Sequence, residues 1–513
     1  MENIFGFDTR VLDRARASRD ARFDGKFFIA VTSTKIYCRP VCKVRDAKRS
    51  NVRYYPTAAA AAEAGFRPCL RCRPEAAPGT PAWLGTLGVV RRGLRLIEEG
   101  ALDDRSVAEM AERLGIGARH LHRLFVQHLG ASPIAVAQTR RLHFAKRLLD
   151  ETRLPITSIA MAAGFRSIRR FNDVFRKTYR RPPGEVRKLR SAEVREAGGD
   201  EVVLRLSYRP PYDWSHLLHF FAARAIARIE VADNERYART VATPGRGWAI
   251  IQVRNVDAEH ALEFRVSCAD ATSLLPLSSV ARRVFDLAAD PATIGLAFED
   301  DPVLAPLVRR RPGLRIPGVW DPFECAVRAI VGQQVSFRAG VTLVSRLVER
   351  AGQAISTPIK GLTHLFPSPL ALISANLGGL GLTGGRIDAI KKLASAVVEG
   401  KVDFSAAAED VVGQLTSIRG IGPWTAQYVA LRALGEPDAF PSTDLVLRRV
   451  ASDTNRTLSP SRLEERSEAW RPWRAYAVIY LWTAALKSGA RLVAAPADTS
   501  RRVRQSGIAL LRG

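Results

Sequence analysis

The sequence predicts a multidomain α+β protein with four parts, and three observations support that prediction. The chain has 513 residues, several times the length of an ordinary domain. Two polar stretches interrupt it, a Pro-rich one at Arg73–Pro81 and one from Arg190 to Glu201 that contains Gly198-Gly199. Near Leu275 an alternating apolar pattern gives way to a helical one. We therefore expect a small zinc domain (1–77), an all-α double helix-turn-helix (83–190), an α/β domain (201–290) and an all-α helix-hairpin-helix domain (291–513).

The charge balance points to a polyanionic partner. Lys+Arg total 78 against 51 Asp+Glu, a formal net charge of +27, and residues 1–200 carry +18 of it. A hydrophobic fraction of 47% excludes a disordered chain. No 18-residue apolar run is present and the first twenty residues are charged throughout, so we expect no membrane partner, no secretory leader and a cytoplasmic, nucleoid-associated protein. The expected partner is double-stranded DNA.

Four of the six cysteines of the chain lie in the first part, and these four have the spacing of a metal site. Three residues separate Cys38 from Cys42, two separate Cys69 from Cys72, and about thirty lie between the pairs. This spacing predicts one Zn²⁺ with four cysteine ligands, which on spacing alone would be structural. Cations beside the cysteines would make a thiolate nucleophilic and hold DNA phosphates. These cations are Arg39, Lys43, Arg45, Lys48, Arg49, Arg67, Arg71 and Arg73.

This part resembles the N-terminal domain of the Ada DNA-repair family. The likeness rests on Asp24-Gly-Lys-Phe-Phe, Tyr37-Cys-Arg-Pro-Val-Cys42, Asn51-Val-Arg-Tyr-Tyr and Gly65-Phe-Arg-Pro-Cys-Leu-Arg-Cys-Arg-Pro74. The resemblance implies that Cys38 is both a zinc ligand and an irreversible acceptor of methyl from DNA methylphosphotriesters. Cys42, Cys69 and Cys72 would be the other ligands. Methylation would remove one negative charge near the phosphates and raise DNA affinity. The alternative is that Cys38 is purely structural.

The second part contains an internal repeat that predicts two helix-turn-helix units. Val107–Ile116 parallels Ile156–Phe165, and Gly115 or Gly164 makes the turn. Ser106 and Glu109 form a capping box. In the second unit a buried stripe is expected at Ile168, Phe171 and Phe175. Residues expected to face outward and contact DNA are Arg169, Arg170, Arg176 and, in the first unit, Arg119. Two amphipathic helices with solvated basic faces are the plain alternative.

These two units resemble the AraC-type DNA-binding domain. The likeness lies in Phe165-Arg-Ser-Ile-Arg-Arg-Phe171 and Phe175-Arg-Lys-Thr-Tyr-Arg-Arg-Pro-Pro183. It implies transcription activation, with RNA polymerase at target promoters as a further partner. The Pro-Cys-His-Arg active-site motif of the Ada C-terminal methyltransferase is absent. Cys268 and Cys325 have no matching context, so we expect them to be core thiols.

In the last two parts, strands are followed by a helical hairpin. Alternating residues at 248–254 and 262–267 predict strands. In Leu415-Thr-Ser-Ile-Arg-Gly-Ile-Gly-Pro-Trp-Thr-Ala426 a helix ends, Gly420-Ile-Gly422 turns, and a second helix begins. The two glycines permit close backbone approach, and the free N–H groups of the following helix suit a phosphate. Asp444 follows Pro441, where a helix cap is the alternative to a catalytic role.

The hairpin and Asp444 resemble the helix-hairpin-helix–Gly/Pro–Asp glycosylases, and most closely the 3-methyladenine DNA glycosylase II (AlkA) family. Further likeness lies in Asp321-Pro-Phe-Glu-Cys-Ala-Val-Arg-Ala-Ile-Val-Gly-Gln-Gln-Val-Ser336 and Trp470-Arg-Pro-Trp-Arg-Ala-Tyr-Ala-Val-Ile-Tyr-Leu-Trp482. The resemblance implies that Asp444 stabilises positive charge on the sugar. It also implies that Trp482, Trp424 and Tyr428 line a base pocket, although all three could be core aromatics.

The same resemblance narrows the reaction and the cofactors. Trp424 stands where bifunctional relatives place a lysine nucleophile, so we expect no strand cleavage. No cysteine follows Cys325, so we expect no iron–sulfur cluster, and nothing in the sequence indicates an organic cofactor. The loop Gly332-Gln-Gln-Val-Ser336 matches the position of the residue that wedges into duplex DNA, which favours Gln334 for that role.

Together these features predict an adaptive-response protein for DNA alkylation repair. A zinc-bound methyl sensor and transcription activator would precede a monofunctional glycosylase that hydrolyses the N-glycosidic bond of alkylated purines such as 3-methyladenine. One alternative is a transcriptional regulator whose C-terminal half binds DNA without catalysis. Another is a repair enzyme in which the zinc site only stabilises the fold.

Overall fold

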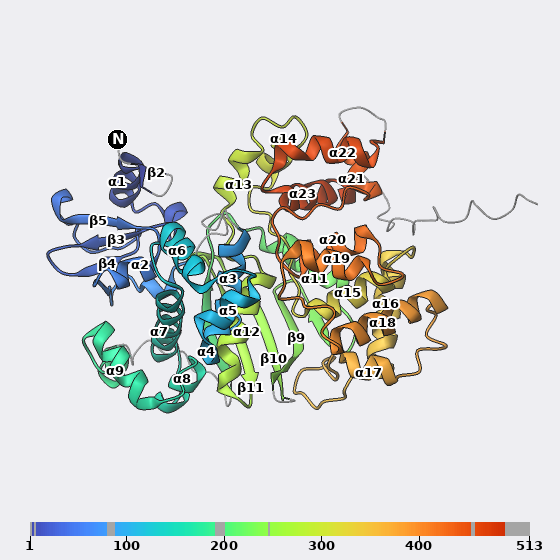
Figure 1. Cartoon of the computed structure of the whole chain (residues 1–513), viewed down its shortest axis with the longest axis horizontal. Coiled ribbons are helices and arrows are strands. Elements are labelled where there is room, and N and C mark those ends of the chain that lie inside the picture. The colour runs from blue at the N-terminus through green and yellow to red at the C-terminus, as the bar shows by residue number, and fades with distance from the viewer. Residues whose placement is uncertain are drawn as a thin grey trace, which may run out of the picture.

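The computed structural model describes residues 3–4, 7–78, 88–189, 201–244, 247–452 and 457–487. In Figure 1 the N-terminal strands lie at the left, a sheet occupies the centre, and the C-terminal helices lie at the right and top. Residues 79–81 of the first predicted linker, 190–200 of the second and 488–513 of the last predicted domain lie outside the described residues. Among the described helices, none is long and apolar enough to cross a membrane.

A four-stranded sheet in the order β5-β3-β4-β6 forms the N-terminal part. Because β4 pairs in parallel with β6, the Cys69 N–H donates to the Tyr37 carbonyl at 3.0 Å. This register brings the two cysteine pairs together. The elements are β1 (Asn3–Ile4), β2 (Phe7–Asp8), α1 (Thr9–Ser18), β3 (Phe28–Val31), β4 (Ile36–Cys38), β5 (Val52–Tyr55), α2 (Ala58–Glu63) and β6 (Arg67–Pro68), with 3₁₀ turns at Ala21–Phe23, Arg49–Asn51 and Pro74–Ala76.

The helix-turn-helix repeat is confirmed. Gly115 and Gly164 turn the two units with φ of 71° and 79°, values that a residue with a side chain rarely adopts. Ser106 and Glu109 form the predicted capping box. The helices are α3 (Gly88–Glu98), α4 (Ala101–Asp104), α5 (Val107–Arg113), α6 (Ala118–Leu129), α7 (Pro133–Glu151), α8 (Ile156–Ala162), α9 (Ile168–Tyr179) and α10 (Pro183–Lys188).

The first residues of the Pro-rich stretch that was predicted to be a linker, 73–78, are ordered. Its 3₁₀ turn buries the Glu75 carboxylate against Lys146 of α7, 3.4 Å away. Arg73 reaches Glu151 at the end of the same helix, at 2.8 Å. Residues 73–78 therefore dock on α7, and the linker prediction is wrong for them because buried ion pairs fix the chain.

The central sheet is antiparallel throughout, in the order β7-β11-β10-β9-β8, and includes both predicted strands. One hydrophobic core joins it to the second helix-turn-helix unit, since Phe171 and Phe175 cluster with Leu204 and Phe264. The boundary between these two parts stays a prediction. The elements are β7 (Glu201–Ser207), α11 (Trp214–Arg224), β8 (Glu230–Ala232), β9 (Arg236–Thr243), β10 (Gly247–Val256), β11 (Ala261–Cys268) and α12 (Leu274–Val284).

The C-terminal part is helical, as predicted, and its core includes buried residues of α15, α20 and α23. Cys325 is buried in that core, which confirms its expected role. Cys268 is half-buried at the end of β11, so a core thiol is the wrong description there. The helices are α13 (Pro291–Ala297), α14 (Leu304–Arg310), α15 (Pro322–Val331), α16 (Phe337–Ala351), α17 (Pro369–Ser374), α18 (Gly384–Val398), α19 (Ala408–Thr416), α20 (Pro423–Arg432), α21 (Leu445–Val450), α22 (Pro460–Ser467) and α23 (Arg474–Lys487).

Candidate functional site

The four clustered cysteines converge beside β4 and β6. The sulfur atoms of Cys38, Cys42, Cys69 and Cys72 all lie within 4.8 Å of one another. The first three are buried and Cys72 is half-buried. Four thiols in so small a volume match the donor set of a closed tetrahedral zinc site. The cluster is the site of one Zn²⁺ with four cysteine ligands, as the sequence predicts.

The cations around the cysteines divide into two groups. Arg45 and Arg71 are exposed and Arg67 is half-buried, so these three remain candidates for phosphate contact. Arg39 instead donates to Asp24 at 2.9 Å, and Arg73 is held in the ion pairs on α7. The expectation that Arg39 and Arg73 hold phosphates is wrong, because both guanidinium groups are committed to carboxylates inside the protein.

The outer face of α9 is basic, as expected. Phe171 and Phe175 are fully buried, whereas Arg169, Arg170 and Arg176 are exposed. Ile168 is 37% exposed, which corrects its place in the buried stripe. It is the first residue of α9, and Phe165 packs on Phe171 in its place, with ring centroids 5.2 Å apart.

Arg119 is also exposed, near the start of α6. The four predicted DNA-contacting arginines of the repeat therefore all reach solvent. Their contacts with DNA stay a prediction.

The helical hairpin has the geometry expected of a phosphate-binding turn. Gly420 has φ of 98°, and a Cβ there would lie 2.8 Å from Ala389 Cβ, so the position requires glycine. Gly422 caps α20 without a side-chain hydrogen bond to the helix. The first N–H groups of α20 are therefore not covered by a capping side chain.

The loop before α16 is tied to this hairpin. Gln333 Nε2 donates to the Gly420 carbonyl at 3.1 Å and to Thr425 Oγ1 at 3.2 Å. The next residue, Gln334, is exposed and has φ of 53°, an uncommon value for a residue other than glycine. Its side chain stands outside the fold beside the hairpin, which suits the predicted wedge.

Asp444 is both a helix cap and a pocket residue. Its Oδ1 accepts the N–H of Leu447 at 2.9 Å and caps α21, while its Oδ2 accepts Trp424 Nε1 at 2.8 Å. The side chain is only 6% exposed, and the exposed portion lines a pocket of about 190 Å³. Capping therefore accounts for one carboxylate oxygen, and the other belongs to the pocket wall.

The three predicted aromatic residues line this same pocket. Trp424 and Tyr428 stack with ring centroids 5.2 Å apart and planes inclined by 15°. Tyr428 and Trp482 are tilted, at 6.2 Å. All three are half-buried rather than core aromatics, so each presents part of its ring to the cavity.

A second wall of the pocket was not predicted. It comes from α11 in the central part, through His216, Phe220 and Arg224, and from Phe337 of α16. Burial lowers the pKa of His216 to about 4, so its ring is neutral at pH 7. The amphipathic pattern of α11 carries no signal for these contacts, because its partners lie more than a hundred residues away.

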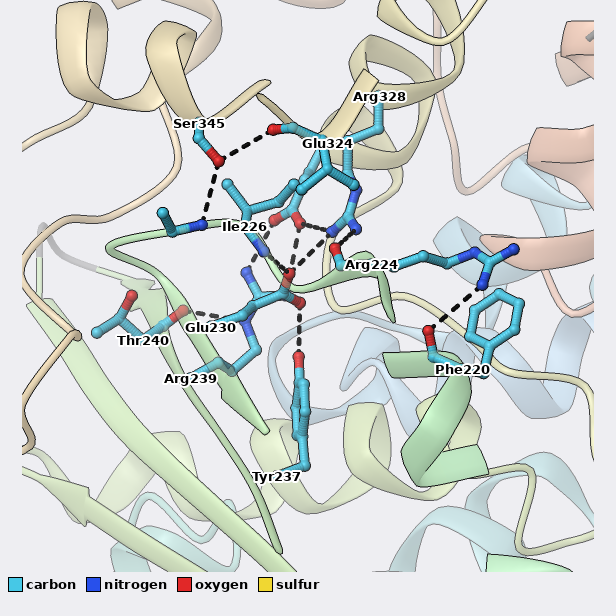
Figure 2. A network of polar contacts seen from close by, with 12 residues as sticks. Phe220, Arg224, Ile226, Glu230, Tyr237, Arg239, Thr240, Glu324, Arg328 and Ser345 are labelled. Carbon is cyan, nitrogen blue, oxygen red and sulfur yellow. Dashed lines mark hydrogen bonds and ion pairs between the residues drawn. The ribbon is translucent and has the colours of Figure 1, made fainter. Parts of the chain in front are cut away.

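Behind this wall, ion pairs join β8 and β9 to α15 (Figure 2). Arg239 pairs with Glu324 at 2.8 Å, and Arg328 pairs with Glu230 at 3.3 Å. Tyr237 donates its hydroxyl to Glu230 at 2.7 Å. These carboxylates hold the pKa of Arg328 above its usual range despite burial. The network thus fixes β8 and β9 against α15, which contributes Arg328 to the pocket lining.

The N-terminal part contacts both of its neighbours. Tyr37, one residue before Cys38, exchanges a 2.9 Å hydrogen bond with His143 of α7. Lys26 forms a buried ion pair with Asp290, the residue that caps α13 in the C-terminal half. The N-terminal part, which carries the cysteine site, is therefore packed against both the helix-turn-helix repeat and the half that carries Asp444.

Four family models match consecutive segments of the chain. The metal binding domain of Ada matches residues 12–75, and a helix-turn-helix domain matches residues 110–189. The AlkA N-terminal domain matches residues 203–321. The HhH-GPD superfamily of base excision DNA repair proteins matches residues 327–475. The resemblances drawn from the sequence motifs are confirmed.

Individual relatives match either nearly the whole chain or one part of it. The "Probable bifunctional transcriptional activator/DNA repair enzyme AlkA" of Mycobacterium tuberculosis is 40% identical over 474 residues, which cover 92% of this chain and 95% of that protein. "DNA-3-methyladenine glycosylase 2" of Escherichia coli is 32% identical over 54% of this chain and 95% of its own length. The "Bifunctional transcriptional activator/DNA repair enzyme Ada" of E. coli is 38% identical over 29% of this chain and 40% of its own length.

Proposed function

This chain belongs to the family of bifunctional transcriptional activators and DNA repair enzymes that join an Ada-type metal-binding part to an AlkA-type glycosylase, and we propose that it both senses and repairs alkylated DNA. Cys38 accepts a methyl group from a DNA methylphosphotriester and activates transcription through the helix-turn-helix repeat. The C-terminal half hydrolyses the N-glycosidic bond of alkylated purines such as 3-methyladenine. The observation that carries the proposal is the position of Asp444 in an aromatic pocket beside the helical hairpin.

The methyl transfer is a single displacement. The Cys38 sulfur attacks the methyl carbon, a sulfur–carbon bond forms, and the carbon–oxygen bond of the phosphotriester breaks. The electron pair leaves with the oxygen, which restores a phosphodiester anion. Zn²⁺ bound by the four cysteines keeps their sulfurs as thiolates at neutral pH. Because the thioether product does not return the methyl group, each molecule reacts once.

The same transfer serves as a switch for DNA binding. It removes one negative charge from a surface that carries Arg45, Arg67 and Arg71. Less repulsion of the DNA phosphates raises affinity. The exposed arginines of α6 and α9 then contact promoter DNA, where RNA polymerase is the expected partner.

In the glycosylase half, the damaged base leaves the stack and enters the pocket of Asp444. The uncovered α20 N–H groups bind a DNA phosphate, and Gln334 fills the gap in the duplex. The bond between C1′ and the base nitrogen breaks with its electron pair going to the base, and the Asp444 carboxylate stabilises the positive charge left on the sugar. Water then adds hydroxide to C1′ and its proton goes to solvent, because the cationic alkylated base becomes neutral when it takes the electron pair.

We assign hydrolysis without strand cleavage. A lyase needs an amine that can form a Schiff base with C1′. Within the described part of the chain no lysine lines the pocket, and the position expected for one is Trp424.

One substrate preparation tests both activities. Duplex DNA treated with a methylating agent contains methylphosphotriesters and alkylated purines. We expect the protein to release free 3-methyladenine, to leave intact abasic strands, and to gain one methyl group on the peptide that contains Cys38. A protein that binds this DNA but releases no base and gains no methyl group would contradict the proposal.

A further inference from the structure

The pocket of Asp444 contains a cation that the proposed chemistry does not use. Arg224 ends α11, and its guanidinium carbon lies 3.7 Å from the ring centroid of Phe220 and 4.3 Å from that of Phe337. In the described part of the chain no carboxylate pairs with it, and its side chain makes one long hydrogen bond, to the Phe220 carbonyl at 3.5 Å. A guanidinium has five N–H donors, so most of them lack an acceptor within the described residues.

The two neighbouring arginines differ from Arg224 in this respect. Arg328 pairs with Glu230 and Glu324, and Arg432 donates to the hydroxyl of Tyr428 at 2.7 Å and to backbone carbonyls. Figure 2 shows the Arg224 side chain pointing away from the two glutamates, toward Phe220. It therefore contributes its charge and its donors to the pocket.

The surroundings of the Arg224 charge make its energy depend on the charge of the base that enters the pocket. Burial, followed by the charges of Arg432 and Arg328, lowers its pKa to about 9. It is still a cation at neutral pH, but its charge is poorly solvated and gains from any acceptor brought into the pocket. A base with a permanent positive charge is instead repelled by Arg224, because the two like charges come together in a site that is partly shielded from water.

We propose that Arg224 determines which damaged bases this site excises. It raises the excision rate of neutral bases that carry an oxygen or nitrogen acceptor, relative to the rate for cationic bases. The inference rests on the proposed glycosylase function. When a neutral base leaves, the electron pair of the broken C1′–N bond places negative charge on the base, and the guanidinium donors stabilise it. A cationic base becomes neutral as it leaves and gains nothing from them. The aromatic rings favour cations, so Arg224 sets the balance between the two classes.

Two probes separate charge from shape. Duplexes containing hypoxanthine or 7-methylguanine at one position both present an oxygen at purine position 6, but only 7-methylguanine is cationic. Single-turnover excision rates are measured with the full chain for the wild type and for Arg224→Met, which keeps the length and the packing on the two rings. We expect Arg224→Met to lose about tenfold or more on hypoxanthine and to lose nothing, or to gain, on 7-methylguanine.

Two further variants guard against a structural explanation. Arg224→Lys keeps the charge without the planar fork, so we expect an intermediate loss on hypoxanthine and no gain on 7-methylguanine. Arg338→Met, which removes an exposed arginine of α16, is the matched control and leaves the ratio of the two rates unchanged.

The outcomes distinguish this inference from the function on which it rests. A ratio of the two rates that stays at the wild-type value in active Arg224→Met and Arg224→Lys proteins overturns the assignment of Arg224 alone. Wild-type protein that releases neither base, while Cys38 still accepts a methyl group, overturns the proposed glycosylase and this inference with it.

Discussion

The indole Nε1 of Trp424 donates a hydrogen bond to Oδ2 of Asp444, at 2.8 Å. The other carboxylate oxygen accepts the Leu447 N–H, so both oxygens of this buried side chain have fixed donors. Trp424 also stacks on Tyr428 and lines the pocket. One side chain thus forms part of the base pocket and orients the carboxylate, which couples base binding to catalysis.

We expect Trp424→Phe to lower the single-turnover rate about tenfold, because phenylalanine keeps a ring against Tyr428 but loses the N–H that orients Asp444. The readout is excision of 3-methyladenine at saturating protein. Trp248→Phe, a half-buried tryptophan of β10 outside the pocket, is the control. A wild-type rate for Trp424→Phe would show that the hydrogen bond has no role in positioning the carboxylate.

We expect methylphosphotriester DNA to place one methyl group on the peptide containing Cys38 and none on a Cys38→Ser protein. The reason is that a zinc-bound thiolate is the nucleophile and serine offers none. Peptide mass spectrometry checks the result, with Cys268→Ser as the control for a thiol outside the cluster. Methyl found on another cysteine, or on none, would end the sensor assignment.

The ion pair between Lys26 and Asp290 joins the two halves of the chain in a buried setting. Lys26→Met should lower the free energy of unfolding by about 3 kcal/mol, because it removes the ion-pair partner of the buried Asp290 carboxylate. Asp290→Asn keeps the α13 cap, so adding it to Lys26→Met should recover most of that loss.

Denaturant unfolding of the full chain measures this double-mutant cycle. Lys392→Met, in an exposed pair with Asp388, is the control and should cost under about 1 kcal/mol. Strictly additive effects of Lys26→Met and Asp290→Asn would mean that the pair does not hold the halves together.

His216 should make the protein less stable in acid. Its folded pKa of about 4 lies below the unfolded value near 6.5, so this contribution is complete above pH 6.5 and is lost as the pH falls toward 4. Between pH 7.5 and 5.5 the loss from this residue is about 1 kcal/mol. Thermal unfolding of the wild type against His216→Gln isolates it. Equal pH dependence in the two proteins would contradict the assigned burial.

The features predictable from the sequence are those set by local spacing. The cysteine pairs, the glycine turns at 115 and 164, and the hairpin at Gly420 each depend on residues close together in the chain. Asp444 could be placed because its distance from the hairpin is part of a motif. Its hydrogen bond with Trp424 could not be, because it depends on how α20 and α21 pack.

The features missed are long-range contacts. Arg224 reaches the pocket from α11, far from the hairpin in sequence, and Arg73 turns inward because α7 presents Glu151 to it. The exposure of Ile168 follows from its position at the first turn of α9, which periodicity alone does not resolve. For Arg224 and Arg73, tertiary packing and not residue type decides the role.

The most direct test of the glycosylase is release of 3-methyladenine from methylated duplex DNA by the wild type and by Asp444→Asn. Asparagine caps a helix as well as aspartate through its one side-chain oxygen, so the variant should fold, but it loses both the negative charge that stabilises the sugar and the acceptor for Trp424 Nε1. We expect a fall of about a hundredfold or more, with no change for the exposed control Asp388→Asn. Undiminished release by Asp444→Asn would remove Asp444 from the mechanism and contradict the account.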